Sequence, residues 1–328
     1  MEEKKATIVI PNYNGKRFLK KCLESIEAQT CNCFETLVID NASSDGSVEY
    51  IRSEFPWVKV HVNRRNLGFA GGVNIGIRLC TTPYVLLLNN DTESSPEFVE
   101  EMIKAIEASD DIFSVSSRMV QYHNRALLDD TGDLYTVLGW GIQRGVGQKV
   151  SGYKEPADVF SACAGAAIYR KYMLDRIGYF DEMHFAYLED IDLGYRARIF
   201  GWRNVYCPTA VVYHVGSGTS GSKYNSFKVK LSARNSVYLN YKNMPLLQLL
   251  VNLPFLTVGC LIKYRFFRSI GYGSDYLDGL KNGIRTCRRC KKVFFQGQHL
   301  KNYVRIEWDL WKNTWIYVQE FVRRKILN

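Results

Sequence analysis

Three acidic side chains lie within four positions of a largely apolar segment. Glu189, Asp190 and Asp192 interrupt the run FAYLEDIDLGYRARIFGW at 185–202. Carboxylates held close together raise one another's pKa, and one of them can then accept a proton near neutral pH. The dipole of a helix N-terminus also favours acidic residues and accounts for one or two of the three. The segment indicates a general base, and the purely structural interpretation stays open beside it.

A second candidate group follows an apolar run that ends in polar residues. The segment LLLNND at 86–91 reads as a buried strand that ends in Asn89, Asn90 and Asp91. A carboxylate at a strand end is well placed to hold a divalent cation. Such a cation is needed when a nucleoside diphosphate is the leaving group, because negative charge develops on the diphosphate as its bond breaks. Taken alone, the simpler interpretation is that these residues cap a turn.

His214 is a third candidate. It follows the β-like run 210–213 and precedes the turn VGSGT at 215–219. An isolated histidine is more often structural than a ligand. The Gly/Ser turn can expose backbone N–H groups to phosphate, which supports a functional role only modestly.

The elements that must position these residues alternate along the first hundred positions. Apolar runs at 7–11, 35–40, 58–62 and 84–88 predict strands, with helical segments between them. Near-continuous apolar strands in this order predict an α/β fold with a mostly parallel sheet and helices on both faces. Ligands bind beyond the carboxyl ends of such strands. The absence of G-x-G-x-x-G after the first strand argues against a dinucleotide-binding site.

The C-terminal quarter differs in charge from the rest. Residues 1–240 contain 27 Lys and Arg against 28 Asp and Glu, whereas residues 241–328 contain 16 against 5. A basic module attached to a neutral one predicts an anionic partner, either nucleic acid or anionic lipid. We therefore expect a catalytic domain over 1–240 and a basic, amphipathic helical extension over 241–328.

The apolar pattern of this extension favours a membrane surface. Residues 245–262 are almost wholly apolar, but Gln248, Asn252 and Pro254 favour an interfacial helix over a spanning one. The last segment has one apolar helical face, followed by basic residues, as suits the headgroup region of a bilayer. An ordinary helix packed on the domain explains this segment equally well. That face comprises Leu300, Val304, Trp308, Trp311, Trp315, Val318, Val322 and Ile326, with Arg323, Arg324 and Lys325 at its end.

The N-terminus and the cysteines indicate an intracellular setting. The first residues contain no apolar run, so no secretory signal is expected. The nine cysteines are scattered, and Cys287 and Cys290 lack the second ligand pair that a zinc site needs. Free thiols in a reducing cytosol are therefore expected.

Seven segments, in order, resemble the family 2 glycosyltransferases of the GT-A fold, in their rhamnosyltransferase-like branch. Together they span residues 7–220. They are TIVIPNYNG at 7–15, ETLVIDNASSDGS at 35–47, NLGFAGGVNIGI at 66–77, YVLLLNNDT at 84–92, SACAGAAIYRK at 161–171, IGYFDEMHFAYLEDIDLGYRARIFGW at 177–202 and VVYHVGSGTS at 211–220.

The resemblance implies a nucleotide site. Pro11 and Tyr13 would line the nucleobase pocket, Asp40 would hydrogen-bond the base, and Asp45 would lie nearby. The wall beside the nucleotide and sugar would be shaped by Asn66, Gly68 and Asn74, and Asn90, within the family's Asp-x-Asp position, would also bind the nucleotide.

The resemblance also implies a catalytic and metal site. Asp190 matches the catalytic base, with Glu189 beside it. Asn89 stands where the family's Asp-x-Asp pattern has its first acid, so Asp91 would carry most of the metal binding. His214 matches a ligand of the metal and diphosphate. The expected cofactor is Mg²⁺ or Mn²⁺.

The expected activity is an inverting transfer by single displacement. The donor would be a nucleotide sugar, either dTDP-rhamnose or a UDP-sugar carrying GlcNAc, Gal or GalNAc. The acceptor would be a lipid-linked saccharide in cell-surface polysaccharide synthesis, reached from the cytoplasmic face of the cell membrane by peripheral binding.

Two other functions are less well supported. A non-catalytic nucleic-acid-binding protein would place its aromatic and basic residues on a sheet face, whereas here the aromatics lie on apolar helix faces. No nucleic acid partner is therefore expected. A nucleotidyltransferase would need a Gly-rich phosphate loop with a lysine after the first strand, and only Lys16 lies there.

Overall fold

The computed structural model describes residues 3–216 and 224–327, with side chains up to Val322. The first four strands form the parallel half of its large sheet, in the order β3-β2-β1-β4. Their bounds are β1 (Ala6–Asn12), β2 (Phe34–Asp40), β3 (Lys59–Val62) and β4 (Tyr84–Leu88). The four strands expected from the apolar runs are thereby confirmed.

The sheet continues past β4 with antiparallel and mixed pairing. Strand β11 pairs antiparallel with β4 and β6, β6 runs parallel to β12, and β5 and β7 add to β12 and β6. A separate two-stranded sheet joins β8 (Asp133–Tyr135) and β9 (Gly141–Gln143). The remaining strands are β5 (Thr92–Ser94), β6 (Ile112–Gln121), β7 (Leu128–Asp130), β10 (Ala157–Val159), β11 (Ala166–Arg170) and β12 (Arg203–His214).

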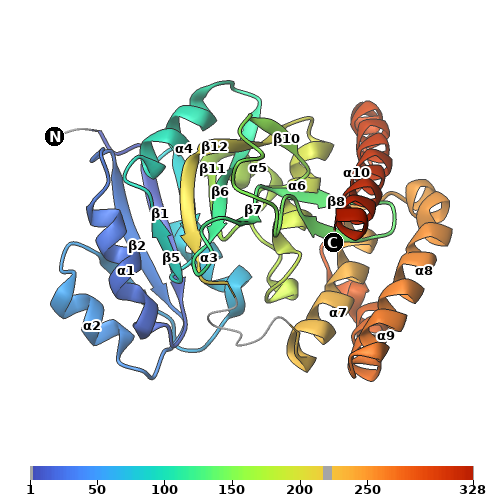
Figure 1. Ribbon diagram of the computed structural model, residues 1–328, viewed down its shortest axis with the longest axis horizontal. Helices are drawn as coiled ribbons and strands as arrows, with labels where there is room; N and C mark the ends of the chain where they lie inside the picture. Colours follow the sequence, from blue (N-terminus) through green and yellow to red (C-terminus); the bar gives the residue numbers. More distant parts are fainter. Residues whose placement is uncertain (1–2, 217–223, 328) are drawn as a thin grey trace.

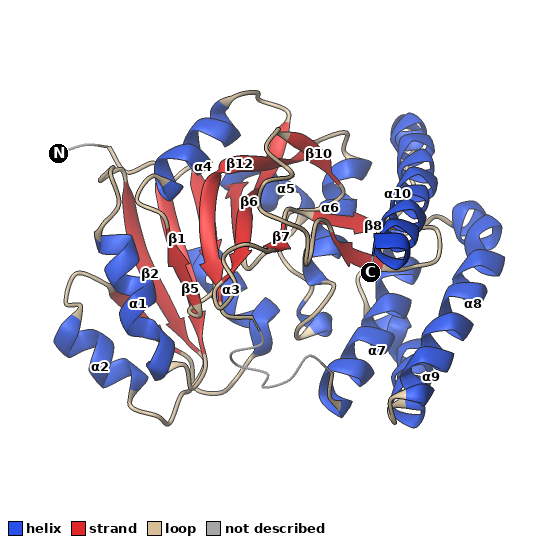
Figure 2. Ribbon diagram, in the orientation of Figure 1, coloured by secondary structure: helices blue, strands red, loops and turns tan. Residues whose placement is uncertain are grey.

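Helices cover both faces of this sheet (Figure 2). Alternate residues of each central strand enter different cores: Ile8 and Ile10 pack on one side, and Val9 on the other. Because both faces are buried, the strands are continuous apolar runs. One face carries α1 (Lys16–Glu27), α2 (Ser47–Glu54) and α4 (Phe98–Glu107); the other carries α3 (Gly68–Leu79), α5 (Lys171–Ile177) and α6 (Glu189–Ile199).

Four further helices lie together beside α6, away from β2 and α2 (Figure 1). They are α7 (Ser226–Asn243), α8 (Leu246–Ser269), α9 (Gly273–Thr286) and α10 (Leu300–Leu327), joined by short 3₁₀ turns at Cys287–Arg289 and Gly297–His299. A third core joins α6 to this group through Leu239 of α7 and through Ile306 and Leu310 of α10. The expected domain boundary at 240 falls inside α7.

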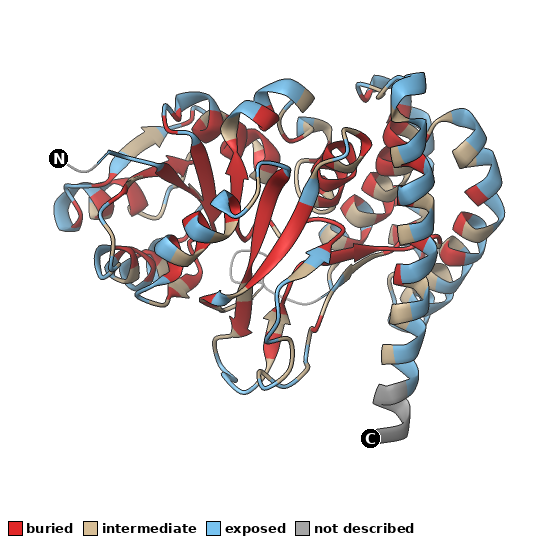
Figure 3. Ribbon diagram, turned by 90° about the horizontal axis from the view of Figure 1, so that it is seen from above, coloured by how far each residue is buried: buried red, intermediate tan, exposed pale blue. Residues whose placement is uncertain are grey.

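Helix α10 packs with the face opposite to the apolar one. Tyr303, Ile306 and Leu310 are buried, whereas Trp308 and Trp315 are 74% and 64% exposed. Every member of the apolar face from Leu300 to Val322 is exposed. Figure 3 shows that exposed residues, in pale blue, recur along this helix. Ile326 and the basic residues 323–325 lie outside the described side chains.

Helix α8 is apolar and also largely exposed. Among the described residues it is the one helix long and apolar enough to cross a membrane by length and composition. Leu247 and Leu250 are 75% and 55% exposed, while Asn252 and Gly259 are buried against the rest of the protein. One side of α8 is therefore packed against the rest of the protein.

The nine cysteines are free thiols. Cys287 and Cys290 are buried in a small cluster with Tyr238. The expectation of free thiols is confirmed.

Candidate active site

Polar residues at the ends of β1 and β2 and just after β4 form one hydrogen-bonded row. The Asn90 amide donates to Oδ1 of Asn12 at 2.7 Å, and the Asn12 amide donates to Oδ2 of Asp40 at 2.9 Å. A Cβ at Gly15 would lie 2.0 Å from the Asn90 amide nitrogen, so only glycine allows this approach. The carboxyl ends of neighbouring parallel strands thus meet, as the strand order predicts.

Asp40 is fully buried, and its other oxygen accepts from the backbone N–H of Ser43 at 2.9 Å. Its carboxylate therefore shapes the loop after β2, and its expected contact with a base stays a prediction. Tyr13 is 38% exposed beyond β1, and Pro11 is half-buried. An exposed ring at a strand end is available for stacking on a base.

Asp45 links the loop after β1 to the loop after β2. Its carboxylate accepts from the backbone N–H groups of Lys16, at 2.9 Å, and Ser47, at 3.1 Å. Burial acts against the charged form, but these bonds and the Ser47 hydroxyl hold the pKa of Asp45 below its usual value. Beside it lies an open cavity of about 650 Å³, lined by Asn14, Lys16, Arg17, Lys20, Asp45 and Tyr50.

Asn66, Gly68 and Asn74 have different surroundings. Asn66 is exposed, and its Oδ1 accepts from the Gly68 N–H at 2.8 Å where α3 begins. Asn74 is buried, and its amide bonds to the backbone N–H and C=O of Phe180 and to Glu182. Any effect of Asn74 on a bound sugar would therefore act through the 180–182 segment.

Asp91 and His214 are neighbours, as the resemblance implied. Strand β5 pairs antiparallel with β12 so that His214 lies opposite Thr92. The His214 Nε2 atom is 3.3 Å from Oδ1 of Asp91. Its Nδ1 atom is 2.7 Å from Oδ2 of Asp129, which belongs to β7. Burial favours the neutral ring, but Asp129 and Asp91 together raise the pKa of His214 to about 10.

This arrangement fits a divalent cation. With Nδ1 held by a carboxylate, the free ligand atom of His214 is Nε2, which faces the buried Asp91. Metal-binding histidines commonly donate their second N–H to a carboxylate in this way. Two protein ligands leave most positions to phosphate oxygens and water, as is usual for Mg²⁺ and its relative Mn²⁺.

The N-terminus of α6 carries the expected base. Burial raises the pKa of Asp190 above its usual value, and burial with the neighbouring Asp190 raises that of Glu189. Glu189 is buried, whereas Asp190 is partly exposed and can therefore reach an incoming hydroxyl.

Two further carboxyls stand beside the base. Burial raises the pKa of Asp130 to about 8, and burial together with Asp130 raises that of Asp133. Among the described residues, Asp130, Asp133 and Cys163 bring their ligand atoms within 4.8 Å of one another. Burial also raises the pKa of the Cys163 thiol, so these groups favour their protonated forms when no cation is bound.

Asp130 connects the two halves of the site. Asp129 and Asp190 disfavour the ionised form of its carboxyl, and His214 favours it. It is fully buried, and its Oδ2 has no hydrogen-bond partner among the described residues. The candidate metal ligands and the candidate base therefore lie within electrostatic range of one buried carboxyl.

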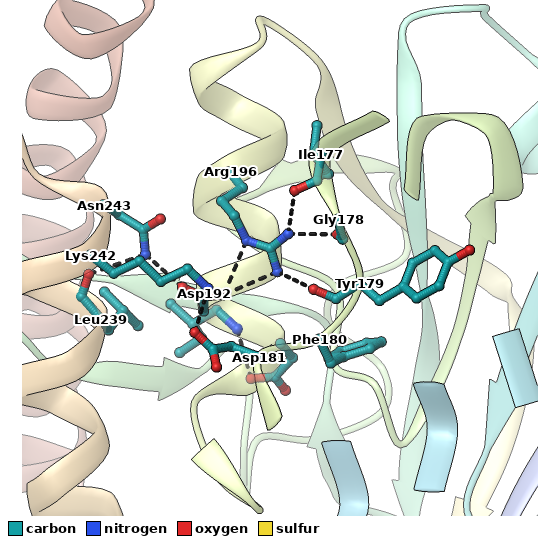
Figure 4. A network of polar contacts seen from close by, with 12 residues as sticks. Ile177, Gly178, Tyr179, Phe180, Asp181, Asp192, Arg196, Leu239, Lys242 and Asn243 are labelled. Atoms are coloured by element: carbon teal, nitrogen blue, oxygen red, sulfur yellow. Dashed lines mark hydrogen bonds and ion pairs between the residues drawn. The ribbon is translucent and has the colours of Figure 1, made fainter. Parts of the chain in front are cut away.

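Asp192 does not take part in this site. Figure 4 shows its carboxylate between Arg196 of α6 and Lys242 and Asn243 of α7. Although burial acts against the charged form, Lys242 and Arg196 hold the pKa of Asp192 far below its usual value. The prediction that three crowded carboxylates raise one another's pKa was wrong for Asp192, because two cations neutralise it.

Sequence reasoning missed Asp129, Asp130 and Asp133. Three carboxylates within five positions, with Gly132 among them, are a signal that the sequence contains. They lie in a stretch without helical or strand periodicity, where acidic residues are ordinarily part of exposed turns. A second cavity of about 510 Å³ lies at the far end of β12, against α10, and contains none of the candidate residues.

The glycosyl transferase family 2 model matches residues 7–178, just over half of the chain. Glycosyltransferase GlyA of Streptococcus pneumoniae is 31% identical over 104 residues, which are 31% of this chain and 15% of that protein. The N-acetylglucosaminyl-diphospho-decaprenol L-rhamnosyltransferase of Mycobacterium tuberculosis is 25% identical over 242 residues, 65% of this chain and 77% of that one.

Solved structures show the same architecture. GalNAc-T7 with UDP, GalNAc and Mn²⁺ has a TM-score of 0.59 at 17% identity, over 72% of this chain and 47% of that one. TarS of S. aureus with UDP-GlcNAc has a TM-score of 0.57 at 16% identity, over 86% and 81%. The fold is the GT-A type of mixed α/β fold.

Proposed function

The chain belongs to glycosyl transferase family 2, and on that basis we propose that it transfers a sugar from a nucleotide diphosphate donor to a hydroxyl acceptor, with inversion. The observation that carries the proposal is the pairing of His214 Nε2 with Asp91 at 3.3 Å, with Asp129 holding the other ring nitrogen at 2.7 Å. This pair would form the cation site for a departing diphosphate, and Asp190, which acts electrostatically on the same buried Asp130 as His214, would be the base for an incoming hydroxyl.

The reaction is a single displacement. The acceptor oxygen forms a bond to the anomeric carbon as its proton passes to the Asp190 carboxylate. The bond from that carbon to the diphosphate oxygen breaks on the opposite side, and the electron pair leaves with the diphosphate. Attack and departure on opposite sides invert the anomeric centre, and no covalent enzyme intermediate is needed.

Asp91 and His214 Nε2 would hold Mg²⁺ or Mn²⁺ against the diphosphate. A bound cation would stabilise the charge that develops on the leaving group. Tyr13 would stack on the base, and Asp45 would hold the loop that closes one side of the nucleotide site.

The donor and acceptor classes rest on likeness to named relatives. Similarity to a rhamnosyltransferase that acts on a diphospho-decaprenol acceptor supports a dTDP-rhamnose donor and a lipid-linked saccharide acceptor. A UDP-sugar is the second candidate donor. The test is incubation of the purified protein with dTDP-, UDP- and GDP-sugars, measuring release of the nucleotide. Release from one class, abolished in Asp190→Asn, is expected; release from none of them contradicts the proposal.

We further propose that α8 and α10 bind an anionic bilayer peripherally, at the cytoplasmic face of the cell membrane. The apolar sides of the two helices meet where Phe255 and Trp311 contact each other, with ring centroids 4.8 Å apart. Exposed cations border the α10 face at Lys301, Arg305 and Lys312. Apolar burial and attraction to anionic lipid act together on such a surface.

The packing of α8 favours an in-plane position over a spanning one. A Cβ at Gly259 would lie 2.1 Å from the Leu138 carbonyl oxygen, and the Trp140 indole donates to the Gly259 carbonyl at 3.2 Å. The catalytic domain therefore contacts the middle of α8. A spanning helix would instead expose its middle to lipid. Peripheral binding would keep the site near an acceptor that cannot leave the bilayer.

A further inference from the structure

The loop in front of the candidate base has an unusual backbone. Phe185, Tyr187 and Leu188 have φ values of 63°, 74° and 65°, in the left-handed region that favours glycine. Leu188 is the N-cap of α6, so this loop determines where the helix begins and how Asp190 is presented. Three non-glycine residues in this region within four positions require neighbouring contacts that hold them there.

Three of those contacts come from one side chain of α7. The Asn235 amide nitrogen lies 2.9 Å from the carbonyl oxygen of His184, and 2.8 Å from those of Ala186 and Tyr187. Asn235 is fully buried. Three carbonyl dipoles converge on a single donor, so loss of that donor would leave them to repel one another.

Arg234 fixes which way the Asn235 amide points. Its Nε donates to the Asn235 Oδ1 at 3.0 Å, which leaves the NH₂ group to face the loop. Its Nη2 donates to the carbonyls of Met183 and His184, each at 2.9 Å. The pair therefore supplies donors to four of the five consecutive carbonyls from Met183 to Tyr187.

The exception is Phe185, whose carbonyl accepts from the Ala70 N–H of α3 at 3.1 Å. A Cβ at Gly68 would lie 2.5 Å from the Phe185 ring, so the loop also lies against the start of α3. The loop is thus held between α3, on the expected donor side, and α7.

We propose that Asn235, oriented by Arg234, is a positioning residue for Asp190. This rests on the proposed function, in which Asp190 is the base. Beyond Asp190, Lys242 and Asn243 of the same helix α7 hold Asp192, as Figure 4 shows. Helix α7 therefore fixes the chain on both sides of the base. Loss of the Asn235 donor lets the loop leave its left-handed conformations and turns the Asp190 carboxylate away from the acceptor.

The test is a double-mutant cycle with Asn235→Ala and Asp190→Asn. Asn235→Ala is expected to lower kcat about 10- to 100-fold with the donor KM within about threefold, since only the base is displaced. In the Asp190→Asn background the same substitution should cost less than about threefold, because no base remains to be displaced. A merely structural role would lower activity equally in both backgrounds.

Asn252→Ala is the matched control. Asn252 is equally buried in the helical group, but it donates to Gln248 and Glu307 and not to the loop. It should lose a comparable amount of thermal stability with little loss of kcat. Arg234→Gln, at a partly exposed position, provides a second test if Asn235→Ala does not fold, and should lower kcat in the same background-dependent way.

The outcomes separate the two claims. If Asp190→Asn is impaired but Asn235→Ala matches Asn252→Ala, or the two losses multiply, the positioning role is overturned and the base assignment stands. If Asp190→Asn keeps near-normal turnover, the base assignment fails and the positioning role fails with it.

Discussion

The imidazole of His214 donates through Nδ1 to the carboxylate of Asp129 at 2.7 Å, on the side of the ring away from Asp91. This contact fixes the tautomer and leaves Nε2 as the atom that can face a cation. Asp129 thereby gives a histidine at the end of β12 the environment of a metal ligand.

Asp129→Asn should weaken the metal site without unfolding it. The amide is similar in shape but cannot hold the Nδ1–H as strongly, so Mn²⁺ affinity in the presence of dTDP or UDP should fall about 10- to 100-fold. Calorimetric titration measures this directly. Asp110→Asn, at a fully exposed side chain, is the control. Unchanged affinity in Asp129→Asn would mean that the Asp129–His214 contact is incidental.

Metal binding should strengthen as the pH rises. With its pKa raised to about 10, His214 is protonated at neutral pH when no metal is bound, and it must lose that proton to become a ligand. Mn²⁺ affinity in the presence of nucleotide should therefore increase by up to about tenfold per pH unit between roughly pH 6 and pH 8. A flat dependence over this range excludes His214 as a ligand.

Asp190→Asn should separate chemistry from binding. The substitution keeps the shape of the side chain and removes the base, so turnover should fall by about 10²–10⁴-fold while the donor affinity stays nearly unchanged. Because Asp190 must be ionised to act and burial raises its pKa, wild-type turnover should rise with pH through a midpoint above that of an ordinary aspartate. Near-normal turnover in the variant would refute Asp190 as the base, and Glu189 would be the next residue to test.

The parallel half of the sheet could be predicted because each of its strands leaves a recognisable pattern in its own stretch of sequence. Strand β4 and its neighbours are buried on both faces, which leaves continuous apolar runs in the sequence. Parallel order then places the strand ends at one edge, so the proximity of Asn12, Asp40 and Asn90 follows from the pattern.

The remainder of the site depends on long-range pairing that leaves no periodic signal. Asp129 reaches His214 only because β7 adds to β6 and β6 lies beside β12. The role of Asp192 was misjudged because its partner Lys242 is 50 positions away. Likewise, the spacing of Trp308 and Trp315 predicts an apolar face, but only the structure shows that Tyr303 and Ile306 form the packing face.

The nucleotide site is expected to prefer pyrimidines. Tyr13 is exposed beyond β1, and Asp45 ties the loops after β1 and β2 together, so their relative position is fixed. Titration should show dTDP or UDP binding ahead of ADP and GDP. Tyr13→Ala should weaken the pyrimidine nucleotides by about 1–3 kcal/mol through lost stacking. Equal affinity for all four nucleotides would remove the claim of a base-selective pocket.

Membrane binding is best tested by substitution, because truncation after residue 240 would cut α7, which supports α6 through Lys242 and Asn243. Trp308→Asp with Trp315→Asp changes two rings that are 74% and 64% exposed. Apolar burial contributes about 1.5–3 kcal/mol per large side chain, so the double variant should bind anionic vesicles at least about tenfold more weakly. Trp57→Asp, at a ring 39% exposed near β3, is the matched control.

Salt distinguishes the two forces that hold such a surface to lipid. Attraction between Lys301, Arg305 and Lys312 and anionic headgroups is screened within about 8 Å at physiological ionic strength, whereas apolar burial is not. In flotation assays, high salt should therefore release the double tryptophan variant completely and the wild-type protein only in part.

If wild type and variant float equally with anionic vesicles, the α8–α10 surface does not bind lipid and is better explained as a contact between protein chains. If the wild-type protein resists both high salt and carbonate, α8 is inserted into the bilayer, and its contacts with Leu138 and Trp140 must open on binding.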